Sequence, residues 1–284
     1  MSITNELDHA IKLSEAKTGS GGYIVGGRVK STYMTREEWE SFKGSMSPQA
    51  LKEYGEGGGD ELSEKNGCPP KMASYGSSSR MIYMLSRDKE GFHYEKKLAT
   101  TVGGKANLDG FYEDENRYVF VEAKCHEPYT AKKNVVSMRY RGLYEYINEH
   151  MAEGLLIKME KSTKDNYMNV EYFVGDEPLE RFDIKQMICH LLGIATGILR
   201  GELEPKQIDF IYLLYDPTQL RLVGKVKETV NAIYTRTCYE CDLVDFEALL
   251  QVIVAYLKKT KYGNAPDKNY KFTFSRQTQK NYLA

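Results

Sequence analysis

Residues 107–125, NLDGFYEDENRYVFVEAKC, decide the fold that we predict for the whole chain. Residues 106–113 and the apolar run 118–121 both have the composition of β-strands. The polar residues 114–117 that lie between them are typical of a tight turn. We therefore predict a β-hairpin in the middle of the chain.

The predicted hairpin brings charged side chains together at one end. Its four-residue turn pairs Glu113 with Tyr118. Counting back along the ladder then sets Asp109 opposite Glu122, and side-chain alternation places Lys124 on the same face. Two adjacent carboxylates repel each other unless a cation lies between them, and hard oxygen ligands suit Mg2+ or Mn2+. The hairpin therefore predicts a metal site with a lysine beside it.

The motif formed by Asp109 and the triplet EAK at 122–124 resembles the signature of the PD-(D/E)xK nuclease superfamily, to which many restriction endonucleases belong. Leu108 stands where that family usually has proline. In a chain with 28% charged residues such a motif also arises by chance, as the charged end of a surface hairpin. The elements predicted around the hairpin favour the resemblance.

These elements follow the order of the family's core: a helix, three meandering strands, a helix and a buried strand. A helix at 80–87 and a strand at 92–100 precede the hairpin. A long apolar-faced helix at 184–200 and the continuous apolar run 208–215, IDFIYLLY, follow it. The resemblance implies an α/β fold with a restriction-endonuclease-like αβββαβ core, a mixed sheet flanked by helices, and helical additions at both ends.

We predict that three regions form one compact domain, since 284 residues with 41% hydrophobic content can bury a large core. Residues 1–76 form an N-terminal region with a Gly-rich loop at 54–71. The nuclease-like core spans residues 77–217 and carries an insertion at about 126–182. Residues 218–284 form C-terminal helices and a basic tail.

The resemblance also implies a role for each residue of the motif. Asp109 and Glu122 would ligate Mg2+ (or Mn2+), helped by the main-chain carbonyl of Ala123. Lys124 would orient and activate the attacking water, while the metal stabilises the charge that builds on the phosphate.

Four further polar residues are candidates for the same site. Glu95, on the predicted first strand, is either a third acid of the metal site or an exposed strand residue. Gln186 and His190 lie four residues apart on one helix face, which resembles an arrangement found near the active site in branches of the family. We expect this polar face to lie against the signature strand, although a lone buried histidine is more often a core residue. Glu61, in the Gly-rich loop, is predicted to be a solvated loop acid.

Two segments have the composition of a nucleic-acid surface. The insertion combines basic residues with tyrosines, and Glu127 begins it just past the signature strand. The segment from Lys258 onward is also basic and rich in aromatic residues. Cations bind phosphates and aromatic rings stack on bases, although a tyrosine-edged helix packed on the core explains the insertion equally well. The residues concerned in the insertion are Tyr129, Lys132, Lys133, Arg139, Tyr140, Arg141, Tyr144 and Tyr146.

Overall charge and cysteine usage limit the class of protein. A net charge of −1 provides no global attraction for nucleic acid, so DNA binding would depend on local basic patches or on bound metal. The chain has no apolar run long enough to span a membrane, and because residues 1–17 carry acids and lack an apolar core we expect no signal peptide. Five cysteines do not suggest a disulfide framework, and we expect a cytoplasmic protein. Cys238 and Cys241, predicted between two C-terminal helices, are two of the four ligands that zinc requires, so buried thiols are favoured.

We therefore predict a metal-dependent endonuclease that hydrolyses DNA phosphodiester bonds, such as a restriction or defence enzyme. Many members of the family cut two strands as dimers, so a homodimer is also an expectation. The first alternative is a catalytically idle protein that keeps the fold and binds nucleic acid or another partner. The second alternative is a nuclease of RNA or of branched DNA.

Overall fold

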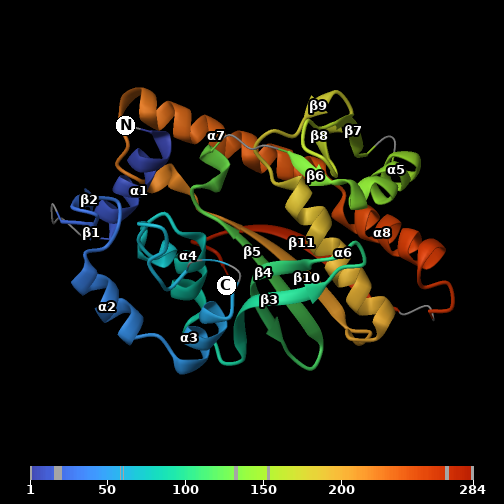
Figure 1. Ribbon diagram of the computed structural model, residues 1–284, viewed down its shortest axis with the longest axis horizontal. Coiled ribbons are helices and arrows are strands. Elements are labelled where there is room, and N and C mark those ends of the chain that lie inside the picture. The colour runs from blue at the N-terminus through green and yellow to red at the C-terminus, as the bar shows by residue number, and fades with distance from the viewer. Residues whose placement is uncertain are drawn as a thin grey trace.

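A mixed five-stranded sheet forms the centre of the computed structural model, which describes residues 2–15, 21–57, 59, 61–130, 134–151, 154–265 and 269–282 (Figure 1). The spatial order of its strands is β11-β10-β5-β4-β3. Strands β3, β4 and β5 form an antiparallel meander, and β5, β10 and β11 are parallel. The bounds are β3 Phe92–Ala99, β4 Lys105–Glu113, β5 Arg117–Lys124, β10 Gln207–Leu214 and β11 Lys271–Thr278.

Each face of this sheet has its own hydrophobic core. Helices α6 (Ile184–Arg200) and α8 (Phe246–Thr260) cover one face, where Tyr118 and Phe120 of β5 point. Helix α4 (Ser78–Ser86) and the N-terminal helices cover the other face, where Val119 and Val121 point. Because adjacent residues of β5 enter opposite cores, the continuous apolar run 118–121 is explained. The remaining bounds in the N-terminal region are α1 Ile3–Ser14, β1 Tyr23–Val25, β2 Arg28–Lys30, α2 Arg36–Gly44 and α3 Pro48–Gly55.

The hairpin and its flanking elements agree with the prediction. Glu113 pairs with Tyr118, so the turn has the predicted register. Helix α4, strands β3 to β5, helix α6 and strand β10 follow one another in the predicted order, interrupted after β5 by the insertion. The protein is therefore an α/β fold with a mixed sheet flanked by helices. None of the helices in the described part of the chain is long and apolar enough to cross a membrane.

Helix α6 is held close to the sheet because of its capping residues and a glycine. The Asp183 side chain accepts a hydrogen bond from the Gln186 amide at the start, and Gly201 adopts a left-handed φ of 76° at the end. At Gly193 a Cβ atom would lie 2.9 Å from Cβ of Ala106 and 3.0 Å from Cβ of Leu98. Glycine at this position lets α6 approach β3 and β4.

Replacing Gly193 by alanine is expected to destabilise the protein by about 1–3 kcal/mol, because the added methyl group overpacks the contact between α6 and the sheet. Gly44→Ala is the matched control, since Gly44 ends α2 and nothing lies within 4 Å of the place that an added methyl group would take. We expect the control to be neutral or slightly stabilising. Urea denaturation of both variants measures the difference, and equal stabilities would contradict the packing described here.

The insertion forms a small layer beside the main sheet. Its antiparallel strands are ordered β6-β8-β7, with β9 paired to β8 and helix α5 packed on β7. Tyr144 and Tyr172 are buried there and share a hydrogen bond of 3.0 Å. Tyr129 is also buried, whereas Arg139 and Arg141 are exposed. The bounds are β6 Val135–Ser137, α5 Arg141–His150, β7 Leu156–Lys161, β8 Tyr167–Val174 and β9 Glu177–Pro178.

The burial of these residues shows which of them pack in the core and which could form a nucleic-acid surface. Tyr129 and Tyr144 are core residues and cannot stack on bases, so the nucleic-acid interpretation is wrong for both. The exposed Arg139 and Arg141 remain available to a ligand. Lys132 and Lys133 lie outside the described residues.

Two predictions for the C-terminal region are corrected. Helix α7 spans Gly224–Leu243, so Cys238 and Cys241 lie within it and not between two helices. Both are free thiols, and Cys241 is buried. Much of the predicted tail is strand β11, which pairs in parallel with β10 along its whole length. Within this segment Arg276 forms an ion pair with Asp242, and Lys280 forms one with Asp216. The local pattern did not indicate this pairing, because parallel partners lie far apart in the sequence.

Candidate active site

Three acidic residues lie in a row across the three antiparallel strands. The pairs Tyr94–Gly110 and Lys96–Leu108 flank Glu95 and Asp109, which form no regular pair themselves. The pairing of β4 with β5 ends at Gly110 and Val121, the residues next to Asp109 and Glu122. On β10, Tyr212 is the parallel partner of Glu122. The row therefore reaches from one edge of the sheet to its centre.

The backbone is distorted where the row crosses β3. Glu95 has a φ of 53°, which non-glycine residues rarely adopt. Tyr94 and Leu98 would share a face of a regular strand, yet they pack in the cores on opposite faces of the sheet. The left-handed residue therefore reverses the side-chain alternation of β3. Backbone strain of this kind gathers at functional sites.

Strand β4 leaves the ladder at the same row. Its last pair with β5 is Gly110 with Val121, and beyond it the Asp109 carboxylate accepts a hydrogen bond of 2.7 Å from the Ala123 amide. The side chain of Asp109 thus occupies the place of a main-chain acceptor. The predicted register holds up to this point, and Asp109 reaches the signature strand through a side-chain contact, not as a regular pair with Glu122.

The Glu122 carboxylate lies between the Lys124 ammonium group and the His190 imidazole. It is 1% exposed, Lys124 donates a hydrogen bond to its Oε1 atom, and Nε2 of His190 lies 2.9 Å from its Oε2 atom. The Lys124 ammonium group also donates to Oε1 of Gln186 at 2.7 Å. The prediction that Gln186 and His190 face the signature strand is therefore confirmed. Helix α6 fixes both ends of the Glu122–Lys124 pair.

The three charges of the motif shift one another's pKa values. Burial raises the pKa of Asp109 well above its usual value, and the charge of Glu122 adds to the rise. Burial also acts to raise the pKa of Glu122, but Lys124 and His190 outweigh it, so that pKa is lowered. For Lys124 the effect of burial is opposed by Glu122 and Asp109, which hold its pKa well above the usual value. Lys124 is therefore a permanent cation at neutral pH.

Two more acids lie at the β3 side of the site. Burial and the nearby charge of Glu61 raise the pKa of Glu95 to about 7, and Glu122 contributes to the shift. The prediction that Glu61 is a solvated loop acid is wrong, because its side chain is 9% exposed and its Oε1 atom lies 3.5 Å from the Lys71 ammonium group. A Cβ at Gly59 would lie 2.5 Å from Oε1 of Glu61, so the loop folds tightly over this acid. Gly58 and Asp60 of the same loop lie outside the described residues.

Sequence reasoning missed Tyr212. Its hydroxyl group is buried and has no hydrogen-bond partner within the described part of the chain, as is also true of Nδ1 of His190. Tyr212 is the partner of Glu122 in the parallel pairing, and burial raises the pKa of its hydroxyl group well above the usual value, so the group is neutral. The signal in the sequence was a tyrosine hydroxyl inside the mostly apolar run 208–215, which also contains Asp209 and Tyr215.

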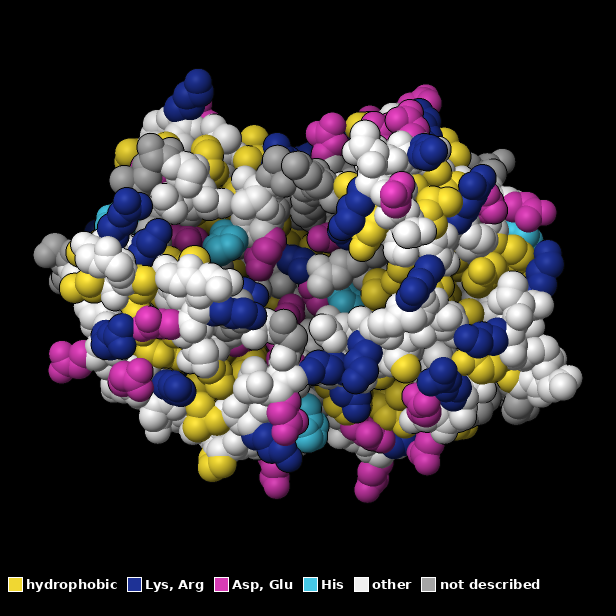
Figure 2. Space-filling view, in the orientation of Figure 1, with side chains coloured by type: hydrophobic (Ala, Val, Ile, Leu, Met, Phe, Trp, Pro, Cys, Tyr) yellow, Lys and Arg dark blue, Asp and Glu magenta, His cyan; other side chains and the backbone are white. Residues whose placement is uncertain are grey.

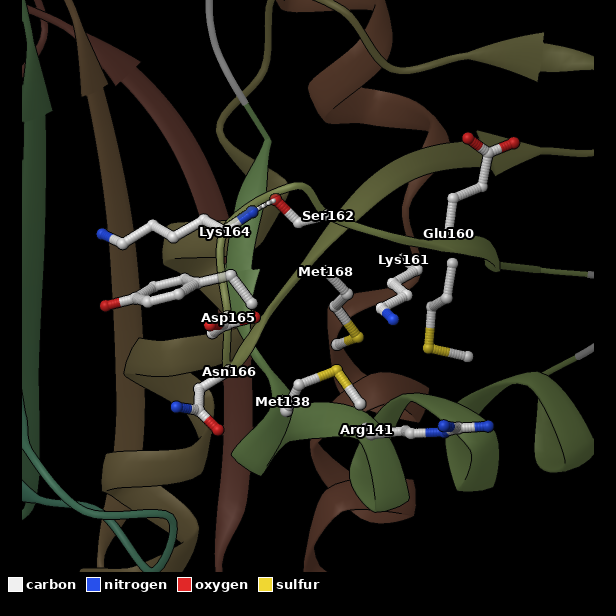
Figure 3. A pocket seen from close by; sticks show the side chains of 11 residues that line it. Met138, Arg141, Glu160, Lys161, Ser162, Lys164, Asp165, Asn166 and Met168 are labelled. Atoms are coloured by element: carbon white, nitrogen blue, oxygen red, sulfur yellow. Dashed lines mark hydrogen bonds between the residues drawn. The ribbon is translucent and has the colours of Figure 1, made fainter.

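The face of the molecule seen in Figure 1 is hollowed near its centre, where the ribbon shows strands of the central sheet. Figure 2 shows acidic, basic and histidine side chains gathered in a depression at the middle of one face. A separate pocket of about 490 Å³ lies in the insertion, where Met138, Met168 and Lys161 line the space beside α5 (Figure 3). None of the predicted site residues lines that pocket, so it does not belong to the acidic row.

The oxygen donors of the site are of the type that binds a divalent cation. Among residues whose placement is described, no group of three or more His, Cys, Asp or Glu side chains is arranged to hold a metal ion. Asp109 and Glu122 provide two carboxylates, and the Ala123 amide points toward β4. Because N–H and C=O of one strand residue point to the same side, the Ala123 carbonyl faces Asp109 as well. Carboxylate and carbonyl oxygens are the ligand types that hard cations take, so the chemistry of these donors suits Mg2+ or Mn2+.

Comparisons with known proteins identify no relative. The chain matches no family model, no curated protein and no solved structure.

Proposed function

We propose that this protein is a metal-dependent endonuclease that hydrolyses DNA phosphodiester bonds, of the restriction or defence type. The observation that carries the proposal is the contact of Asp109 with the strand segment that bears Glu122 and Lys124, together with the hydrogen bond from Lys124 to Gln186. The order α4, β3, β4, β5, α6, β10 supports a restriction-endonuclease-like core. We also propose a cytoplasmic location and a homodimer that cuts both strands.

In this proposal Asp109, Glu122 and the Ala123 carbonyl hold Mg2+ or Mn2+. The raised pKa of Asp109 supports this role, because a cation would offset the repulsion between the two buried carboxylates. When bound, the metal supplies a Lewis acid for the phosphate and lowers the pKa of a bound water. Each oxygen of Glu122 already accepts one contact, from Lys124 or His190, so a cation would bind at a remaining lone pair or replace one of these partners.

Lys124 acts as a hydrogen-bond donor. Since it is protonated, it orients the attacking water and stabilises the charge that develops on the phosphate, and it does not remove a proton. Gln186 positions the ammonium group, and His190 holds the second oxygen of Glu122. Glu95 is proposed as a third acid at the β3 side of the site, where its pKa of about 7 makes it responsive to a nearby cation.

One observation favours a second candidate function. Both oxygens of Glu122 already have partners, and an ion pair satisfied in this way is compatible with a catalytically idle protein that binds nucleic acid. The two functions differ in their response to metal.

Incubation of supercoiled plasmid with the wild-type protein in Mg2+, Mn2+ or EDTA tests the proposal. We expect nicking or linearisation in either metal, no cleavage in EDTA, and a loss of roughly a thousandfold in Asp109→Asn. A protein that shifts the plasmid on a gel but never cuts it would favour the idle alternative. Competition with RNA or branched DNA identifies a different nuclease substrate.

A further inference from the structure

The region just past Lys124 contains an imidazole group that the proposed chemistry does not use. His126 follows the end of β5 and precedes the short 3-10 helix η2 (Glu127–Tyr129). Its side chain is 34% exposed, whereas that of Lys124 is 8% exposed. Two residues of chain span at most about 7 Å, so His126 lies beside the site and closer to solvent.

This imidazole is held by a buried carboxylate from the N-terminal helix. Nδ1 of His126 lies 3.3 Å from Oδ1 of Asp8, which belongs to α1 and is 5% exposed. A Cβ at Gly76 would lie 1.8 Å from that Oδ1 atom and 2.7 Å from that Nδ1 atom. Asp8 and His126 therefore pack directly on the backbone of Gly76, and only glycine leaves room for the pair.

Glu127, the acid next to His126 in the sequence, does not compete with Asp8 for the hydrogen bond to the ring. Glu127 uses one oxygen to accept from the Ser78 hydroxyl at 2.8 Å and the other to accept from the Cys125 amide at 2.7 Å. Asp8 thus fixes the ring with Nδ1–H directed inward, which leaves Nε2 without a protein partner among the described residues. Burial acts to lower the pKa of His126, but the hydrogen bond from Asp8 and the charge of Glu127 outweigh it and raise the pKa.

We propose that His126, oriented by Asp8, binds a backbone phosphate of the nucleic acid next to the bond that is cleaved. The inference rests on the proposed function and adds one contact to it. The Cα atoms of Lys124 and His126 lie at most about 7 Å apart, so the imidazole can reach a phosphate within about two nucleotides of the one at Lys124, since a strand rises about 3.4 Å per nucleotide. Asp8 is a positioning residue, and the N-terminal region thereby becomes part of the binding surface. The charged groups that face the ring are Asp8 from α1 and Glu127 from η2.

Binding of a fluorescently labelled duplex of about 20 base pairs, measured by anisotropy in EDTA at about pH 5.5 and 8.5 over a range of salt concentrations, tests the inference. We expect the wild type to bind more tightly at the lower pH. His126→Gln should lose most of that gain, keeping only the part that protonation of Glu95 contributes, and should reduce the slope of log affinity against log salt by about one at the lower pH. His126→Lys should restore tight binding with the same small pH dependence as His126→Gln. Asp8→Asn should shift the gain in affinity to lower pH, because the imidazolium loses the carboxylate that stabilises its charge.

His150→Gln is the matched control, since His150 is an equally exposed histidine beside Glu149 at the end of α5, in the insertion. If His126→Gln keeps the wild-type slope and pH dependence while the plasmid is still cut, the inference fails and the proposed function stands. If the wild type neither binds the duplex nor cuts plasmid, the proposed function fails and the inference fails with it. Thermal unfolding of each variant shows that it is folded.

Discussion

Lys124→Met should lower the rate of plasmid cleavage by about a thousandfold or more. The affinity for Mn2+ should stay the same or increase. Lysine acts on the water and on charge that develops in the transition state, whereas the cation is bound before the reaction begins. Removing the ammonium group also removes a positive charge that repels the metal. Calorimetric titration with Mn2+ beside a plasmid time course separates the two effects.

Lys105→Met provides the control for this substitution, because Lys105 is exposed on β4 at the start of the same sheet. It should change neither metal binding nor cleavage. If the Lys124→Met protein cuts at the wild-type rate, the proposed role of Lys124 in the reaction is wrong, even if Asp109 proves essential.

Glu122→Leu should lower the free energy of unfolding by about 3–5 kcal/mol in the absence of metal, because it leaves the Lys124 charge buried without its partner. The double variant Glu122→Leu with Lys124→Met replaces both charges by apolar groups. It should recover most of the lost stability, since an apolar pair of similar volume carries no desolvation cost. Urea denaturation of the two single variants and the double variant measures this coupling.

If the double variant is as unstable as Glu122→Leu, the ion pair between Glu122 and Lys124 does not account for the stability of this region. The comparison also shows whether a Glu122 variant loses activity through unfolding, which cleavage assays alone do not reveal.

The hairpin could be predicted because its signals are local. Strand composition, turn length and alternation within residues 106–124 are sufficient to bring Asp109 to the segment of Glu122 and Lys124. Helix spacing likewise placed Gln186 and His190 on one face, and the apolar side of α6 then required that face to meet β5.

Other features depend on contacts between distant segments. The burial of Glu61 arises because the Gly-rich loop folds against Lys71, and the left-handed backbone of Glu95 appears only when β3 joins the sheet. The pairing of β11 with β10 joins residues more than 60 positions apart, and no local pattern indicates it. Helix α7 continues through Cys238 because Glu240 is buried beneath Arg181 and Phe182, whose amides donate to its carboxylate.

The claim that two carboxylates share one cation has a direct structural test. Crystals of the wild-type protein grown with Mn2+ should show an anomalous scattering peak between Asp109 and Glu122, near the Ala123 carbonyl. Asp109→Asn crystals grown in the same way should lack the peak. Wild-type crystals without a peak there, in which Glu122 keeps its contacts with both Lys124 and His190, would contradict the account.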